Sequence, residues 1–400
     1  MPTGRTYTFL LAALLFYLFA NQTQTGWLYV VAAVLGGAVL AGWLLNRGAI
    51  DRITAERQIT DESDRPIHEG DDIHITLTLD NQRRFAAAHL QLTEHCVLAA
   101  PESDEREFSI FVPLLPQRIQ YDYAVTVYRR GVQRFRPLAI ASRAPFGFFT
   151  RREAIDIGTE RLIYPTVRKL SQLDLLDRQP AAELTNPRTG LGSEVIGVRP
   201  YRPGDSPRHI HWRSVARRQQ LISKEFAQET QPGVTIVLDR YSPLPATIET
   251  KHTPFEMAVK CAVSIAEYAL RQRYPVYLAA DTEEIAFPRG ALVWDAIMQY
   301  MAKVHTRNRA TLADVLTFQP LQKYVAVVLA WHDADVIEPL IALKHRGVGL
   351  LVVMPDVPTY PIDTQASIKD FVATLRAHDI TVRVIQHGDD WADALSNPAR

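Results

Sequence analysis

Two long apolar runs open the chain, and neither contains a charged residue. Residues 6–20 read TYTFLLAALLFYLFA and residues 26–45 read GWLYVVAAVLGGAVLAGWLL, with the polar turn NQTQT between them. The second run has the length of about 20 residues that a helix needs to cross a bilayer, and the first reaches it with its polar flanks. A cleaved signal peptide would leave the second run unexplained. Residues 1–50 are therefore predicted to form a transmembrane helical hairpin.

Charges around these runs predict how the hairpin is oriented. Arg5 flanks one outer end, and Arg47 and Arg52 flank the other, whereas the turn carries no charge. Because basic flanks stay on the cytoplasmic side, both outer ends are expected there. Trp27 and Trp43 lie near the ends of the second run, as interface anchors do. The sequence thus predicts a multi-pass protein of the inner (plasma) membrane, with its soluble domains in the cytoplasm.

Apolar and polar residues alternate after the hairpin. The segment DDIHITLTLDN (71–81) places Ile73, Ile75, Leu77 and Leu79 on one face, and YDYAVTVYRRG (121–131) repeats the pattern. Period-two apolarity between turn residues is typical of antiparallel strands with one solvated face. Residues 51–150 are predicted to form a β-sandwich that the aromatic turn APFGFF closes. Residues 151–230 are then interpreted as a linker followed by a basic segment.

From residue 231 onward the period changes. Near-continuous apolar runs alternate with helical patterns, of which PFEMAVKCAVSIAEYALRQR (254–273), with Pro254 in its first turn, is the clearest. The apolar runs are 234–238, 276–280, 325–330, 348–353 and 380–385. This alternation predicts an α/β domain over 231–400 with a doubly wound, mostly parallel sheet covered on both faces. Ligands of such sheets bind beyond the carboxyl ends of the strands.

Composition and motifs narrow the function classes. The 44 basic and 44 acidic residues cancel, so no overall field favours nucleic acid as a partner. The two cysteines, Cys96 and Cys261, are interpreted as buried thiols in a reducing compartment. The chain contains no GxxxxGK[ST], GxGxxG or GxSxG motif, so nucleotide and nucleophilic chemistry lack their usual machinery. We therefore expect no cofactor.

The strand that ends at Asp239 resembles the first strand of a von Willebrand factor type A domain. In that family a metal-ion-dependent adhesion site reads Asp-x-Ser-x-Ser, with a Thr and an Asp from two further loops. Here Tyr241 and Pro243 occupy the serine positions, and Trp331 stands where the third-loop Asp would be. A cation needs several oxygen ligands, so we expect a metal-free sheet whose Asp239 caps or orders the loop. The alternative is a degenerate metal site, whose ligands would be Asp239, Ser242 and Thr311, with Asp333 as a loose substitute for the lost Asp.

Residues 188–228 form a local basic segment with eight Lys or Arg and three acids. Three interpretations of this segment remain open. Asp205, His209 and His211 could serve as metal ligands or as acid and base, with the two histidines on one side of an extended chain. The arginines could bind an anion or a lipid headgroup. They could also pair with acids and carbonyls in a structural and docking role, which is the interpretation we favour.

The order of residues in EVIGVRPYRPGDSPRHIHWRSVARRQQLISKEFAQE resembles the signature of the family called domain of unknown function 58. The matching positions include Arg199, Tyr201, Gly204, Asp205, Arg208, His211, Trp212, Arg217 and Glu225. The earlier YRRGVQRFRPLAIASRAPFGFF is similar to a second family pattern, with Ala144 in place of an Asp. The resemblance extends over paired membrane helices, a β-sandwich, the signature and a degenerate von Willebrand A-like domain.

The resemblance implies that the protein works with a protein partner and does not indicate a catalysed reaction. Family members are often encoded beside MoxR-type AAA+ ATPases, and no catalytic residues are established for them. We therefore expect a membrane-anchored, non-enzymatic adaptor or assembly factor that acts through protein–protein interaction. The alternative is a metal-dependent or anionic-lipid-acting enzyme that uses Asp205, His209 and His211.

Overall fold

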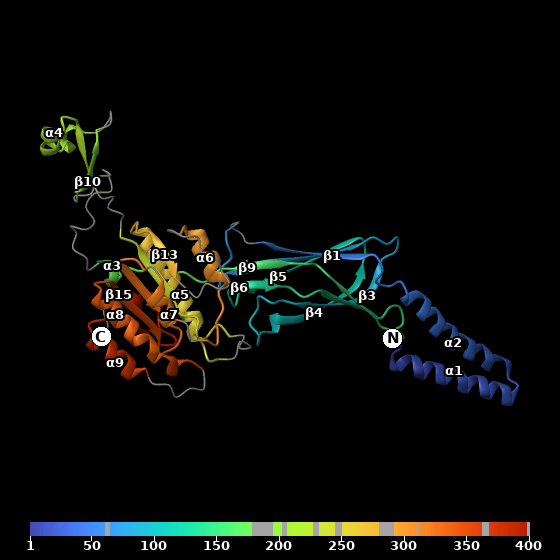
Figure 1. Ribbon diagram of the computed structural model, residues 1–400. Coiled ribbons are helices and arrows are strands. Elements are labelled where there is room, and N and C mark those ends of the chain that lie inside the picture. The colour runs from blue at the N-terminus through green and yellow to red at the C-terminus, as the bar shows by residue number, and fades with distance from the viewer. Residues whose placement is uncertain are drawn as a thin grey trace. The chain divides into compact units, whose positions relative to one another are not determined.

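A computed structural model describes most of the chain, and within it the chain divides into two compact units (Figure 1). The described residues are 1–60, 65–177, 195–201, 206–226, 232–244, 250–279, 292–309, 312–319, 321–361 and 368–397. The first unit comprises Met1–Thr166, Pro245–Lys251 and Met298–His305. The second comprises Val167–Leu244, His252–Ile297 and Thr306–Arg400.

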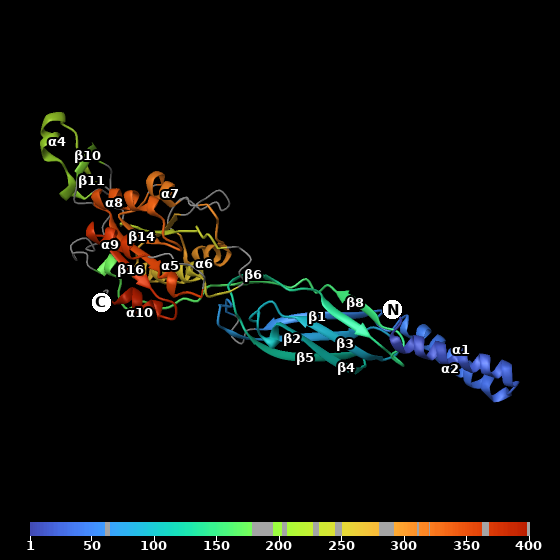
Figure 2. The same ribbon diagram turned by 90° about the horizontal axis from the view of Figure 1, so that it is seen from below.

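The two apolar runs form helices α1 (Gly4–Thr23) and α2 (Gly26–Asn46), which lie side by side (Figures 1 and 2). The rings of Tyr17 and Tyr29 meet edge to face between them, with centroids 5.9 Å apart. Among the described residues, α2 is the single helix long and apolar enough to cross a membrane. Helix α1 carries polar residues in both end turns, which lower its hydropathy. Most large apolar side chains of both helices are exposed rather than packed against protein.

Antiparallel strands follow the two helices in the first unit. They are β1 (Ile53–Thr60), β2 (Asp72–Asn81), β3 (Ala87–His95), β4 (Glu107–Leu115), β5 (Arg118–Thr126), β6 (Gly131–Arg134), β7 (Leu138–Ser142), β8 (Arg151–Ile155) and β9 (Glu160–Ile163). They form a three-stranded sheet β1-β2-β5, a four-stranded sheet β4-β3-β7-β8 and the pair β6-β9. The antiparallel strands therefore continue to Ile163, past the expected boundary at 150, because β8 pairs with β7 and β9 with β6.

The two larger sheets share one core. Ile53 and Leu79 of the three-stranded sheet pack in the same cluster as Leu90, Leu92 and Ile140 of the four-stranded sheet. The alternation in β2 is confirmed, because Ile73, Ile75, Leu77 and Leu79 are fully buried. A β-sandwich as a fold family stays a prediction, but antiparallel sheets joined by a common apolar core are observed.

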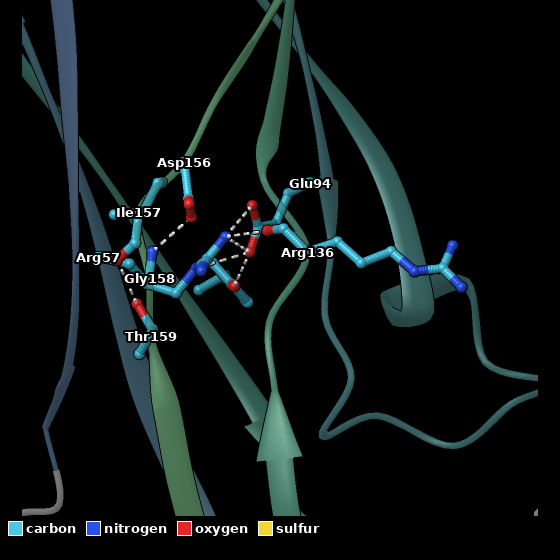
Figure 3. A network of polar contacts seen from close by, with 8 residues as sticks. Arg57, Glu94, Arg136, Asp156, Ile157, Gly158 and Thr159 are labelled. Atoms are coloured by element: carbon cyan, nitrogen blue, oxygen red, sulfur yellow. Dashed lines mark hydrogen bonds and ion pairs between the residues drawn. The ribbon is translucent and has the colours of Figure 1, made fainter.

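A charged pair lies buried between these two sheets. The guanidinium of Arg57 on β1 donates from Nε and Nη2 to the two carboxylate oxygens of Glu94 on β3, each at 2.9 Å (Figure 3). Both side chains are fully buried. The hydroxyl of Tyr123 donates to Glu94 at 3.3 Å, and the guanidinium lies 4.4 Å over the ring of Phe135. The pair links strands of two different sheets.

The aromatic turn at 144–149 contacts the helices. The backbone N–H of Thr3 and the hydroxyl of Thr6 both donate to the carbonyl oxygen of Phe148, and the Phe148 ring meets Phe9 edge to face at 4.7 Å. On α2, a Cβ added to Gly42 would lie 3.0 Å from the Phe148 ring. The expectation that this turn closes the sheets is therefore incomplete, because the Phe148 side chain packs against α1 and α2 instead of into the sheet core.

The second unit is built on a parallel sheet of five strands. These are β12 (Val234–Leu238), β13 (Val276–Ala279), β14 (Tyr324–Val328), β15 (Gly349–Pro355) and β16 (Thr381–Ile385). Their order is β13-β12-β14-β15-β16 with every pairing parallel. The strand order reverses between β12 and β14, and such a switch point is where open α/β sheets bind ligands.

Helices cover this sheet. They are α5 (Pro254–Arg271), α7 (Leu312–Phe318), α8 (Ile337–His345), α9 (Lys369–Ala377) and α10 (Trp391–Ser396). Helix α6 (Trp294–Lys303) is divided between the units, because Met298–His305 belongs to the first. Residues of α7, α8 and α9 share a core cluster with Val325 and Val327 of β14. The alternate residues Tyr324, Ala326 and Val328 face the other way and are also fully buried. Helix α5 contacts β12, β14 and β15, as the predicted helix at 254–273 requires.

The first part of the expected linker is packed into the second unit. Residues 168–177, which include the short helix α3 (Asp174–Asp177), bury Leu170, Leu173 and Leu176. Tyr268 donates its hydroxyl to Asp177 at 2.7 Å, and Arg383, with a side chain 4% exposed, pairs with Asp174. This stretch is therefore a structural element of the domain and not a free connection, because its leucines need an apolar surface.

Candidate functional site

The basic signature forms a small hairpin, here called the signature hairpin (residues 195–201 and 206–226). Strand β10 (Val195–Pro200) pairs antiparallel with β11 (Ile222–Phe226), and Arg199 lies opposite Ser223. Between the strands lie a 3-10 turn, η3 (Pro207–His209), and helix α4 (Trp212–Arg218). Of the predicted residues, Gly204 and Asp205 lie outside the described residues, as do the side chains of Arg199 and Glu225.

His211 holds the start of α4. Its Nδ1 accepts from the backbone N–H of Ser214 at 3.3 Å and lies 2.7 Å from the Ser214 hydroxyl, so the imidazole is the N-cap of the helix. The His211 backbone N–H donates to Ile222, which ties the cap to β11. His211 therefore has a structural role as the cap of α4.

The signature hairpin has a small interior of its own. Ile210, Ile222 and Ser223 are 8%, 4% and 2% exposed. Ile210 forms an isolated bridge with Ser223, and the Tyr201 backbone N–H donates to the Leu221 carbonyl. These contacts set the shape of the hairpin from within its own sequence.

The outer surface of the signature hairpin combines apolar and cationic side chains. Trp212 is 64% exposed, Leu221 49% and Val198 41%. The guanidinium-bearing residues Arg208, Arg213 and Arg217 are exposed as well. Trp and Arg are the residue types most enriched at binding hot spots, so this surface has the chemistry of a protein interface.

The expected histidine arrangement is not what the structure contains. His209 and His211 do not lie on an extended chain, because His209 ends a 3-10 turn and His211 caps a helix, with the buried Ile210 between them. Nowhere in the described part of the chain do three or more His, Cys, Asp or Glu side chains come close enough to hold a metal ion. The interpretation of Asp205 as a partner of these histidines falls on a residue that the structure does not describe.

Asp239 lies at the switch point of the parallel sheet, directly after β12. Its side chain is 4% exposed, and Oδ1 accepts from the backbone N–H of Tyr241 at 2.9 Å. Backbone N–H groups of Ala330 and Trp331, in the loop after β14, also donate to it. The carboxyl group thus joins the two loops that follow neighbouring strands, which is how a loop-ordering residue acts.

Burial makes the Asp239 carboxyl a weaker acid than usual. Desolvation raises the pKa of its carboxyl to about 7, while the three backbone N–H donors oppose that rise. The nearby charge of Asp333 adds a smaller increase. A buried acid that titrates near neutrality at a switch point is a recognised mark of a functional position.

Other predicted residues around Asp239 have local partners. The Ser242 hydroxyl accepts from the Leu244 backbone N–H at 3.3 Å, and Asp333 Oδ1 accepts from the Asp335 backbone N–H at 3.1 Å. Thr311 lies outside the described residues, so the degenerate metal site stays a prediction. Asp239, Ser242 and Asp333 thus each accept a hydrogen bond from a backbone N–H two residues further along the chain.

Sequence comparison identifies the signature. The family description "Protein of unknown function DUF58" matches residues 197–315, which contain most of the signature hairpin and Asp239. The uncharacterized protein YeaD of Bacillus subtilis (strain 168) is 24% identical over 307 residues, 74% of this chain and 73% of its own length. Both matches support a protein of the DUF58 family. Its signature residues thus include the helix cap and the exposed surface of the hairpin.

Solved structures add no functional argument for this protein. A GH20 exo β-N-acetylglucosaminidase from Vibrio harveyi aligns over 82% of the chain and 60% of its own length, with 8% identity and a TM-score of 0.21. An exo-chitosanase from Amycolatopsis orientalis aligns over 83% of the chain and 32% of its own length, with 8% identity and a TM-score of 0.18. Scores this low do not establish a common fold.

Sequence reasoning missed two features of this chain. The sequence did contain a signal for the buried Arg57–Glu94 pair. Glu94 follows Leu90 and Leu92 at the inward positions of a strand, where a charge requires a partner. The contact of Phe148 with α1 and α2 had none, because it joins residues more than a hundred positions apart.

Proposed function

We propose that this protein is a membrane-anchored, non-enzymatic adaptor or assembly factor that works through protein–protein contacts made by its signature hairpin. The proposal depends on one observation: Trp212 and three arginines are all exposed on one short segment that has its own interior. A residue as large and apolar as Trp is stabilised by burial, so its exposure at a family signature favours a partner that covers it.

The anchor is formed by the two N-terminal helices. In the proposal both α1 and α2 cross the inner membrane, and the two units lie in the cytoplasm. The apolar side chains that cover both helices support this arrangement, as do Arg5, Arg47 and Arg52 at the outer ends. The tight turn between Thr23 and Gly26 supports a hairpin, since it places both outer ends on one side.

The chemistry of the signature hairpin suggests the character of the partner. Arg208, Arg213 and Arg217 favour a surface that presents carboxylates around an apolar pocket able to take an indole ring. A MoxR-type AAA+ ATPase is the partner that the family resemblance implies. In this proposal the second unit is a degenerate von Willebrand A-like domain, whose strand-end loops around Asp239 provide a further contact.

The test uses the full chain solubilised from membranes and a purified MoxR-type ATPase encoded in the same genome. We expect Trp212→Ala to weaken the complex by tenfold or more, since hot-spot truncations cost at least about 2 kcal/mol. Phe318→Ala is the matched control, because Phe318 is an aromatic residue 80% exposed on α7. Equal binding by the Trp212 variant and the unchanged protein would refute the role of the signature hairpin.

A further inference from the structure

Eight arginines and one acidic residue occupy the chain segments that meet where α2 ends. These segments are residues 1–5, 47–52, 82–86 and 143–152, and the single acid is Asp51. The arginines, here called the junction arginines, are Arg5, Arg47, Arg52, Arg83, Arg84, Arg143, Arg151 and Arg152. Because acids and bases are equal in number over the whole chain, this local excess is a property of one end of the first unit.

Tertiary contacts bring the four segments together. Asn46, the last residue of α2, donates from its side-chain amide to the Ala144 carbonyl at 2.9 Å. The Gln82 backbone N–H donates to the Arg52 carbonyl, so the loop after β2 lies beside the start of β1. Strand β8 begins at Arg151, which is paired with Ser142 at the end of β7. Residues 1–5 lie beside the same turn, because the Thr150 backbone N–H donates to the Met1 carbonyl. All four segments therefore lie near the C-terminal end of α2.

Most of this positive charge has no acidic partner. Arg151 forms ion pairs with both Asp51 and Glu153, at 2.7 and 2.8 Å, so a single guanidinium neutralises both nearby carboxylates. The other exposed junction arginines form no ion pair within the described part of the chain. They are Arg5, Arg47, Arg52, Arg84, Arg143 and Arg152. Such a surface attracts anions that come from outside the protein.

Exposed aromatic residues lie among these arginines. Phe85 is 73% exposed, Phe146 52% and Trp43 41%, and the guanidinium of Arg47 lies 4.6 Å over the Trp43 ring. Trp43, Arg47, Phe149 and Arg151 also line a hollow of about 370 Å³. Aromatic rings beside cationic groups at the end of an apolar helix are typical of the interface between lipid tails and headgroups.

We propose that the junction arginines and these aromatic residues form a binding surface for the phosphate headgroups of anionic phospholipids. The lipids belong to the leaflet in which α2 ends, and the hollow beside Trp43 receives one headgroup. The inference rests on the proposed anchoring through α2. It goes beyond anchoring because it assigns a lipid class and makes the first unit, not only the helices, part of the membrane contact.

Membrane topology alone does not explain these arginines. Basic residues set orientation when they lie within about 20 residues of a membrane helix. Arg5, Arg47 and Arg52 satisfy that condition, but Arg84, Arg143 and Arg152 lie far beyond it in the sequence. Folding, rather than sequence proximity, places them at the end of α2, so their shared position indicates a function of the folded protein.

The test compares bound lipids on the full chain, solubilised in a neutral detergent and offered equal amounts of phosphatidylglycerol and phosphatidylcholine. Native mass spectrometry counts each lipid. We expect phosphatidylglycerol to be preferred, and the triple variant Arg52→Gln, Arg84→Gln and Arg143→Gln to reduce that preference by roughly tenfold to a hundredfold. The preference should also fall as salt is raised from about 0.1 M to 1 M.

The matched control replaces three exposed arginines elsewhere in the first unit, Arg65→Gln, Arg136→Gln and Arg161→Gln. It should keep the preference. Equal binding of the two lipids by the unchanged protein, or the same loss in both triple variants, would overturn the proposal. A wrong anchoring proposal would give a different result. Alkaline carbonate would then release the chain from vesicles, whatever the charge of their lipids.

Discussion

The guanidinium of Arg57 and the carboxylate of Glu94 form a bidentate pair that lies wholly inside the first unit, with both side chains fully buried. Arg57 belongs to the three-stranded sheet and Glu94 to the four-stranded sheet. The pair therefore ties two sheets together at a point where the surrounding core is apolar. Its two members stabilise each other, because either charge alone would be buried without a counterion.

Removing one member of the Arg57–Glu94 pair should strongly destabilise the first unit. We expect Glu94→Gln to lower the free energy of unfolding of the first unit by about 3–5 kcal/mol, because Arg57 would keep its charge in a dry site. Hydrogen exchange of peptides from β1 and β3 in the full chain measures the loss. Asp80→Asn is the control, since Asp80 and Arg118 form a similar bidentate pair on the surface, where little change is expected.

Removing both members tests the same relationship from the other side. The double variant Arg57→Met and Glu94→Leu should be close to the unchanged protein in stability, because an apolar pair of similar volume avoids the desolvation of two ions. This gain offsets the hydrogen bond that the Tyr123 hydroxyl loses when Glu94 is replaced. A double variant as unstable as Glu94→Gln would contradict this account. It would mean that shape, rather than charge, makes the position sensitive.

The buried carboxyl of Asp239 predicts a pH dependence. With its pKa raised from 3.8 to about 7, the folded chain binds a proton that the unfolded chain has released. The stabilising contribution is therefore full below pH 3.8 and is lost as pH rises through 7, a change of roughly 4 kcal/mol. Thermal unfolding of the second unit between these pH values measures it. Asp239→Asn, which keeps an acceptor and cannot ionise, should flatten the profile, and an unchanged profile would refute the assignment.

The imidazole cap of α4 predicts a local effect. His211→Ala should weaken the helix by about 1 kcal/mol, because the Ser214 backbone N–H loses its acceptor. Faster hydrogen exchange of residues 212–218 in the full chain is the expected result. His211→Asn supplies another N-cap acceptor and should restore protection. Loss of protection in both variants would mean that the ring is needed for something other than capping.

The contact between Gly42 and Phe148 can be tested with a control on the same helix. A side chain at Gly42 meets the Phe148 ring, whereas one at Gly37 meets nothing within 4 Å. Gly42→Leu should displace the turn at 144–149, so that trypsin cleaves faster after the exposed Arg143. Gly37→Leu should leave the cleavage rate unchanged. Equal rates in both variants would show that α2 does not hold the turn.

Much of the fold could be predicted because its signals are local. Alternation placed Ile73 to Leu79 on a buried face, and helical spacing after Thr253 and Pro254 predicted α5, whose N-cap is that threonine. The apolar run at 234–238 became β12 without change. In each case the period of the pattern equals the period of the element, so neighbouring residues suffice.

The roles of the candidate site residues were harder to predict from the sequence. The sequence pointed to His209, His211 and Asp239 as residues of interest, but their roles depended on partners. The neighbours that decide these roles are the Ser214 backbone N–H for His211 and the loop after β14 for Asp239. Residue type indicates what a side chain is able to do, and geometry decides which of these possibilities it uses.

The sequence by itself determined the apolar helices, the change from antiparallel to parallel strands, and the family signature. Tertiary structure alone decided that Glu94 meets Arg57, that Phe148 packs against Gly42, and that distant arginines gather at the end of α2. The physical reason is range. Periodicity and helix capping act over a few residues, whereas a buried charge pair or a basic surface exists only after the chain has brought distant segments into contact.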